Sequence, residues 1–302
     1  MVAVFSGCKK EYAPPVVTAP ASSNVEINKS VDLTFQFTAE AGFSSASVTA
    51  TGGTATIKTD GTAGATTGNI VVTFSAGTST GAGSVSLTIT DNENQTGQSV
   101  GILTVDAVQT VSITQNVTTN SLWEAGRIYI LEGRIAVTSG ATLTIQPGVI
   151  VKGRDGSGSN ATALVIARGG KLIAEGTAES PIIFTSVADL IIPGQIASPN
   201  LQPALNGLWG GLLVLGKAPI SASAEAVQIE GIPASDLNGL YGGTDPLDNS
   251  GSIKYISIRH GGANIGEGNE INGLTLGGVG SGTVIENVGS QVCRLKVVNM
   301  FT

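Results

Sequence analysis

The sequence has few charged residues, few aromatic residues and very little cysteine or histidine. Charged residues make up 12% and aromatic residues 4% of the 302 residues, with one His and two Cys. The net charge is −7, and the 15 basic residues are scattered singly. Because phosphate binding needs clustered Lys and Arg, the composition excludes a nucleic-acid partner.

The scarcity of cysteine, histidine and long apolar runs excludes further classes of protein. Two cysteines exclude a disulfide framework, and a single histidine excludes a metal site built from several histidines. No apolar run approaches the ~20 residues of a membrane-spanning helix. Disorder is also excluded, because 41% of the residues are apolar. Glycine, in contrast, is plentiful: its 42 residues are about twice the ordinary share of ~7%.

Residues 1–8 end in a cysteine that resembles a bacterial lipoprotein processing site. Ser6 and Gly7 precede Cys8, and an apolar stretch precedes them. That stretch is shorter than the ~7–15 residues of a complete signal. We therefore interpret residues 1–8 as a truncated lipoprotein signal with Cys8 as the lipidation site. Residues 9–22, which contain three prolines, are expected to form a tether.

Residues 16–106 alternate apolar and small polar residues in short runs separated by Gly, Asn and Asp. The runs 31–37 and 84–90 are examples, and both are enriched in β-branched residues. A period of two predicts strands with one buried face. About seven such strands predict an immunoglobulin-like β-sandwich, although the Cys–Trp–Cys core of antibody domains is absent. Beside an anchor, such a module most often acts as a spacer.

Residues 109–288 change to shorter apolar runs of about three to five residues. Tyr129 and Ile150 lie 21 residues apart, and Ala136 and Val165 lie 29 apart with a Gly-rich loop of eight residues between them. A period of about 21 residues with three short strands predicts a parallel β-helix. A leucine-rich repeat has a similar period, but its Leu–Leu–Asn spacing is missing.

Two long segments, residues 188–208 and 232–251, interrupt this pattern. Both are rich in Pro, Gly, Asn and Asp. Insertions leave a solenoid at the corners between its strands and commonly build its binding face. We therefore expect these two insertions to carry ligand-contacting residues.

Several glycine-containing motifs give the chain a family resemblance. They are residues 140–153, 170–186, Trp209-Gly210-Gly211, 239–243, Ile258-Arg259-His260-Gly261-Gly262 and 270–283. Through them the chain resembles secreted right-handed parallel β-helix proteins of pectate-lyase-like fold, many of them surface lipoproteins of Bacteroidetes. The resemblance implies an all-β protein that is anchored to the outer membrane or secreted. Members continue beyond residue 288, so residues 289–302 look like the atypical tail of a chain truncated at its C-terminus.

His260 is the single histidine, and with Arg259 it stands at the end of a predicted strand. On a concave sheet these two side chains are candidates for catalysis in a polysaccharide lyase or glycoside hydrolase. No paired or repeated Asp supports them, so we favour a corner histidine that hydrogen-bonds loop backbone. No catalytic residue is assigned, and the chain is interpreted as non-enzymatic.

Trp209 and Tyr241 are notable because aromatic residues are scarce. If exposed, they would stack on sugar rings; alternatively, they fill the core beneath the two insertions. Together with Arg259, His260 and Glu267 they are the candidate ligand-binding residues.

A cation site is the remaining candidate. Asp245, Asp248 and Asn249 carry oxygens of the kind that bind Ca²⁺, but their spacing differs from an EF-hand loop. Since Asp and Asn dominate ordinary turns, we favour a turn here and expect no cofactor.

The leading hypothesis is a cell-surface binding or adhesion module for an extracellular polysaccharide or a surface protein. The alternatives are a β-helix lyase or hydrolase, and a structural protein of the cell envelope. Membrane contact is expected through the lipid anchor only.

Overall fold

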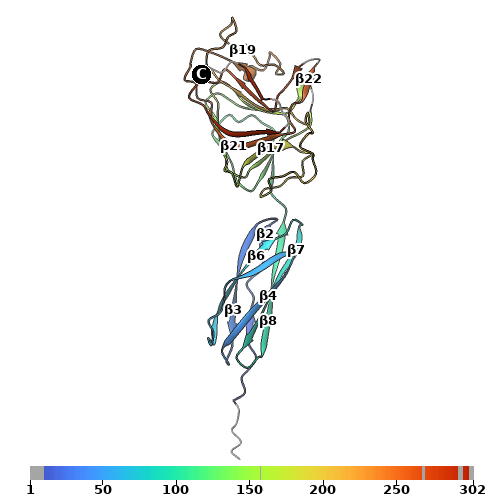
Figure 1. Cartoon of the computed structure of the whole chain (residues 1–302), viewed down its shortest axis with the longest axis vertical. Coiled ribbons are helices and arrows are strands. Elements are labelled where there is room, and N and C mark those ends of the chain that lie inside the picture. Colours follow the sequence, from blue (N-terminus) through green and yellow to red (C-terminus); the bar gives the residue numbers. More distant parts are fainter. Residues whose placement is uncertain (1–9, 157, 267–268, 292–294, 299–302) are drawn as a thin grey trace, which may run out of the picture. The chain divides into compact units, whose positions relative to one another are not determined.

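The computed structural model describes residues 10–156, 158–266, 269–291 and 295–298, in which nearly all regular secondary structure is β-strand (Figure 1). Within these ranges the exceptions are two short 3₁₀ helices, η1 (Gly158–Asn160) and η2 (Leu237–Gly239). No helix in the described part of the chain is long and apolar enough to cross a membrane. The chain divides into two compact units, Met1–Ala107 and Val108–Thr302.

The first unit is a β-sandwich of two four-stranded sheets, ordered β1-β3-β6-β5 and β2-β8-β7-β4. Burial alternates along β3 and β7, because one face of each sheet packs against the other sheet. Leu33, Phe35, Phe74 and Leu87 are among the buried core side chains. The strands are β1 (Val16–Thr18), β2 (Ser23–Glu26), β3 (Ser30–Thr38), β4 (Phe43–Thr51), β5 (Gly53–Thr59), β6 (Thr67–Ala76), β7 (Gly81–Asp91) and β8 (Thr96–Asp106).

The sandwich has one strand more than the sequence pattern predicts. β1 pairs with β3 in one sheet, whereas β2 pairs with β8 in the other. The chain crosses between the sheets through residues 19–22, which include Pro20. Both strands are only three or four residues long, too short for an alternating pattern to separate them.

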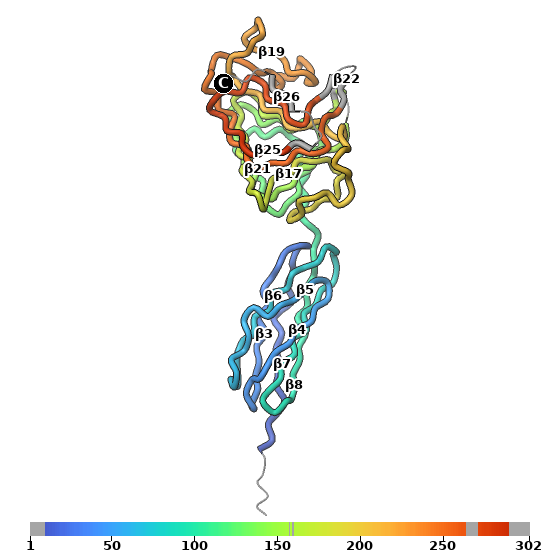
Figure 2. The backbone as a smooth tube through the Cα atoms, viewed as in Figure 1, coloured from blue at the N-terminus to red at the C-terminus, as the bar shows by residue number. Residues whose placement is uncertain are grey.

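The second unit is a parallel β-helix with three columns of stacked strands, whose coils can be followed in Figure 2. One column is β12-β15-β18-β24-β26, and the other two are joined in a sheet ordered β10-β13-β16-β21-β17-β14-β11-β9. Neighbours in these columns pair in parallel. The strands are β9 (Thr110–Ile113), β10 (Ser121–Trp123), β11 (Ile128–Leu131), β12 (Arg134–Val137), β13 (Thr142–Ile145), β14 (Ile150–Gly153), β15 (Ala163–Ile166), β16 (Lys171–Glu175), β17 (Ile182–Ser186), β18 (Gly211–Leu215), β21 (Gly251–Arg259), β24 (Leu274–Gly277), β25 (Val284–Gln291) and β26 (Leu295–Val298).

The predicted repeat is confirmed with a one-residue correction. Ala136 pairs with Val165, as the spacing of 29 residues requires. Tyr129 pairs with Val151 rather than Ile150, so that coil holds 22 residues instead of 21. Inside the coils lies a continuous aliphatic core that includes Leu143, Leu164 and Leu212.

The two insertions cover outer faces of the β-helix. In the first, Ile191 packs against Ile150 and Ile183. In the second, Ile232 packs in a cluster with Val165, and the short hairpin strands β19 (Val227–Gln228) and β20 (Leu240–Tyr241) precede and follow η2. Consequently β14, β15, β17 and β18 are buried on both faces, as is usual for parallel strands covered on both sides. A second small hairpin is formed by β22 (Asn264–Gly266) and β23 (Asn269–Glu270).

Candidate functional site

Trp209 and Tyr241 are buried, which is the second of the two alternatives that the sequence left open for them. Trp209 has no exposed surface, and its Nε1 donates a hydrogen bond to the carbonyl of Arg259 at 2.8 Å. The ring lies so close to Gly153 that a Cβ there would be 2.6 Å from it. Tyr241, in β20 of the second insertion, contacts Gly277 in the same way and packs in a cluster with Leu215 and Ile232. Glycines leave the room in which both rings are buried, so neither ring is available to stack on a sugar.

His260 lies at a corner immediately after β21, in the left-handed conformation with a φ of 57°. Its side chain is 1% exposed, and Nδ1 lies 2.7 Å from the carbonyl oxygen of Leu205 in the first insertion. Since a carbonyl can only accept, Nδ1 carries the proton. Nε2 faces Asp189 Oδ2 at 4.0 Å and has no hydrogen-bond partner in the described part of the chain.

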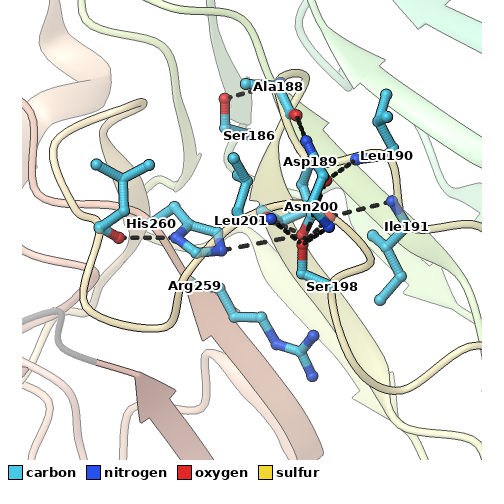
Figure 3. A network of polar contacts seen from close by, with 12 residues as sticks. Ser186, Ala188, Asp189, Leu190, Ile191, Ser198, Asn200, Leu201, Arg259 and His260 are labelled. Atoms are coloured by element: carbon cyan, nitrogen blue, oxygen red, sulfur yellow. Dashed lines mark hydrogen bonds and ion pairs between the residues drawn. The ribbon is translucent and has the colours of Figure 1, made fainter.

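Asp189 is the centre of a polar network that ties the first insertion to the sheet (Figure 3). Its carboxylate accepts hydrogen bonds from the hydroxyls of Thr185 at 2.9 Å and Ser198 at 2.7 Å, and from the backbone N–H of Ile191 at 3.0 Å. Its backbone carbonyl accepts from Lys152 Nζ at 2.5 Å. The network therefore joins β14, β17 and the insertion.

Two cations lie beside this carboxylate and are nearly buried. Lys152 pairs in register with Thr185, and Arg259 ends β21 one residue beyond the pair of Phe184 with Ile258. Burial lowers the pKa of both side chains, and the charge of Asp189 opposes that effect. Arg259 Nε donates to Ser257 Oγ at 2.9 Å, and Figure 3 shows the guanidinium directed away from Asp189 and His260.

This network does not offer a catalytic surface. Asp189 is fully buried and His260 nearly so, so neither side chain is accessible to a polymer in solution. Catalysis on a polysaccharide requires its acid and base to reach the glycosidic bond or a ring proton. The arrangement instead positions the insertion. In it His260 hydrogen-bonds loop backbone, and Arg259 is not presented to a ligand.

The three oxygen-bearing residues considered for Ca²⁺ stabilise turns. Asp245 Oδ1 accepts from the N–H of Leu247 at 3.0 Å, and Asn249 Oδ1 accepts from the N–H of Gly251 at 2.9 Å. Asp248 is 5% exposed and accepts from Ser250 Oγ at 3.1 Å. Within the described residues no group of three or more His, Cys, Asp or Glu converges to hold a metal. The remaining candidates, Glu267 and Cys8, lie outside the described residues.

A polar cleft opens on the outer face of the column that contains β12 and β15. It has a volume of about 430 Å³ and lies between these strands, the end of β11 and η2. Its polar lining consists of Asn116, Glu132, Arg134, Asn160, Asp236 and Asn238.

The charged groups of the cleft are paired. Arg134 Nε lies 3.3 Å from Asp236 Oδ2, and the amide of Asn238 donates to Asp236 Oδ1 at 3.0 Å. Glu132 accepts from Arg154 Nε at 2.8 Å and from Ser112 Oγ at 2.8 Å. The hydrogen bond from Arg154 is the main reason why the pKa of Glu132 is lowered. The cleft therefore presents amides, carboxylates and a guanidinium with little net charge.

A second groove of about 430 Å³ lies on the sandwich, along β1, β3 and β6. Its polar lining is limited to threonines and the amides of Gln36 and Asn69, with no charged side chain. Since oriented polar groups give a binding site its specificity, the cleft on the β-helix is the stronger candidate.

Comparison with known proteins assigns the second unit to a family. Residues 111–294 match the family described as the pectate-lyase-like beta helix domain. The chain belongs to this family. No curated protein matches the chain. A solved structure of a mutant SrpA adhesin from Streptococcus sanguinis is similar at 12% identity and a TM-score of 0.28, over 33% of this chain and 60% of the adhesin chain.

Membership in the pectate-lyase-like β-helix family describes the fold, and the site must be argued from its own residues. The polar lining of the cleft comes from the segment before β12, from β12 itself, from the η1 region and from the second insertion. No local motif connects these segments, so sequence reasoning did not find the cleft. The one available signal was the predicted position of the second insertion.

Proposed function

We propose that the protein is a non-enzymatic binding module that holds an extracellular glycan in the polar cleft beside β12 and β15. The observation that carries this proposal is the chemistry of the cleft wall. Sugar hydroxyls both donate and accept hydrogen bonds, and the wall offers both kinds of partner through Asn160, Asn238 and the pair of Arg134 with Asp236. A hydrogen-bonding cleft of about 430 Å³ can hold one stretch of a long polymer.

The proposal places this module at the cell surface as a lipoprotein of the kind found in Bacteroidetes. The sequence supports it through Cys8, which follows Ser6 and Gly7, and through the proline-containing residues 9–22. Acylation of Cys8 would hold the chain at the outer membrane, with the sandwich as a spacer before the β-helix. In that setting the partner is extracellular, and a surface protein is the alternative ligand.

The lyase or hydrolase alternative is less well supported by the cleft. Glu132 and Asp236 are two carboxylates in one cleft, as glycoside hydrolysis requires. However, a general acid needs a raised pKa, whereas the pKa of Glu132 is lowered by its ion pair with Arg154. The third alternative, a structural role in the envelope, predicts no ligand.

Native affinity electrophoresis tests the proposal. The full chain, carrying Cys8→Ser to prevent acylation, is run in gels that contain laminarin, xylan, mannan, polygalacturonate or alginate. We expect at least one intact polymer to retard the protein. Asn160→Trp, which places a large side chain at an exposed position in the cleft, should abolish that retardation. Asn206→Trp, at an exposed asparagine outside the cleft, is the matched control.

The other outcomes separate the alternatives. A cleared zone in the gel would show that the polymer is cut and would overturn the non-enzymatic assignment. Unchanged mobility in every gel would contradict glycan binding and favour a protein partner or a structural role. Loss of retardation in both asparagine variants would remove the cleft from consideration.

A further inference from the structure

Tyr255 occupies an unusual corner of the β-helix. β21 pairs with β16 as far as Lys254, and from Ile256 it pairs with β17. Tyr255 is the residue at which the strand passes from one column to the next, and its φ of 47° is left-handed. A bulky residue in this conformation is an outlier, whereas Asn and Gly adopt it readily.

The neighbouring coils use small residues at the same corner. Asn287 in β25 occupies the corresponding place, between Glu286, which pairs with Lys254, and Val288, and it has a φ of 52°. On the other side Gly176 follows β16, and a Cβ there would lie 2.5 Å from the carbonyl oxygen of Tyr255. The geometry of this corner therefore favours a small residue, and tyrosine is conformationally strained there.

Tyr255 is 39% exposed, so part of its surface faces solvent. Among the described residues of the β-helix unit, the other aromatic side chains are buried. They are Trp123, Tyr129, Phe184, Trp209 and Tyr241. A strained residue whose aromatic side chain stays partly exposed is a reason to look for a function at that position.

The residues that precede the corner form a charged ladder across three coils. Lys254 Nζ lies 3.9 Å from Glu175 Oε1 and 3.5 Å from Glu286 Oε2. Ser252 Oγ donates to Glu175 at 2.5 Å. Both carboxylates are about half exposed and so can accept further hydrogen bonds. With two carboxylates and one ammonium, the ladder carries a net charge of −1.

We infer that Tyr255 and the ladder of Glu175, Lys254 and Glu286 form a second sugar-binding subsite, specific for neutral polysaccharide. The tyrosine ring supplies an apolar face on which the C–H face of a pyranose ring stacks. The carboxylates accept hydrogen bonds from sugar hydroxyls. Their net negative charge repels uronic or sulfated polymers. This inference rests on the proposed glycan-binding function.

Because Tyr255 is conformationally strained, a substitution can separate its effect on binding from its effect on stability. Tyr255→Asn removes the ring and installs the residue that the next coil uses, so its thermal midpoint should equal or exceed that of the wild-type chain. Its dissociation constant for the neutral polymer should nevertheless rise at least about fivefold. Tyr255→Phe should keep the affinity. Leu122→Asn, which removes an exposed apolar side chain from β10, is the matched control and should bind like wild type.

Affinity electrophoresis of the full chain in gels with graded laminarin, xylan or mannan measures these constants, and polygalacturonate and alginate are the acidic comparators. The inference is overturned if Tyr255→Asn binds as well as wild type, or if the acidic polymers bind more tightly than the neutral ones. Should Asn160→Trp lose binding while Tyr255→Asn keeps it, the cleft stands and this subsite fails. If the wild-type chain binds no polymer, the proposed function fails and this subsite fails with it.

Discussion

At the scale of single residues, the charges beneath the first insertion determine how stability depends on pH. Lys152 and Arg259 are nearly buried, with Asp189 as the carboxylate that opposes the effect of burial on both. A buried charge is tolerated when an opposite charge lies nearby and hydrogen bonds satisfy it. If one of these groups is removed, the desolvation penalty of the remaining charge is no longer offset. Substitution of Lys152, Asp189 or Arg259 is therefore expected to lower the stability of the β-helix.

The lowered pKa of Lys152 predicts the direction of one pH effect. Above the folded-state pKa and below the unfolded value near 10.5, the unfolded chain binds more protons than the folded chain. The contribution of Lys152 to stability therefore rises with pH across that window. When the pH is raised from 7 to 9.5, the free energy of unfolding measured in urea should increase more for wild type than for Lys152→Met. Equal gains in the two proteins would contradict the prediction.

At the scale of elements, the first insertion is fastened to the sheet by both apolar and polar contacts. Ile191 packs on Ile150 and Ile183, while Asp189 joins β14 and β17 through Lys152 and Thr185. The insertion thus behaves as a covering layer, and the network around Asp189 is one of its polar attachments; Gly207, Leu208 and Leu205 provide another at the corner after β21.

Asp189→Asn should loosen this layer. The substitution keeps the shape of the side chain but puts an amide N–H₂ where a carboxylate oxygen accepts from Thr185, Ser198 or the N–H of Ile191. A lost buried hydrogen bond of this kind costs on the order of 1–3 kcal/mol. We expect a lower urea midpoint for the β-helix and faster proteolysis within residues 188–208, mapped by mass spectrometry. Asp245→Asn, at an exposed carboxylate that caps a turn, should change neither. Similar cleavage in both variants would argue against the attachment.

The elements also show how far the sequence predicts this structure. The pairing of Ala136 with Val165 follows from the apolar period, because stacked strands must bury equivalent side chains. The paths of the insertions do not follow, since isolated apolar residues such as Ile191 and Ile232 have no period to reveal what they cover. The sequence leaves two alternatives for Trp209 for a related reason, because the space that Gly153 leaves for the ring depends on a neighbouring coil.

The candidate site was less predictable than the fold. The cleft gathers Asn116, Arg134, Asn160 and Asp236 from segments far apart in the chain, and only the three-dimensional winding brings them together. Tyr255 carries no sequence signal of its own, because its left-handed φ and its exposure appear only once β21 is seen to pass between columns.

At the scale of the whole molecule, we propose different roles for the two units: the sandwich is a spacer and the β-helix binds the ligand. The sandwich has a groove without charged side chains, whereas the β-helix carries the charged cleft and the exposed tyrosine. A spacer followed by a binding unit is the organisation that an anchored surface protein needs, and this proposal depends on acylation at the N-terminal end.

The anchor can be tested by metabolic labelling. In a bacterium that makes the protein, wild type should incorporate labelled palmitate and partition with the outer membrane. Cys8→Ser should lose the label, because the acceptor thiol is gone, while Cys293→Ser should keep it and is the matched control. Label that persists in Cys8→Ser would refute the lipoprotein assignment.

The layer formed by the first insertion has a consequence for how this protein can change in length. In many solenoids a long loop can be trimmed without harm. Here a deletion would uncover Ile150 and Ile183, which the insertion now covers, and so expose an apolar strip on the outer face of β14 and β17. A relative with a shorter insertion would also need polar residues in place of Ile150 and Ile183. The insertion and the coil beneath it are therefore expected to evolve together.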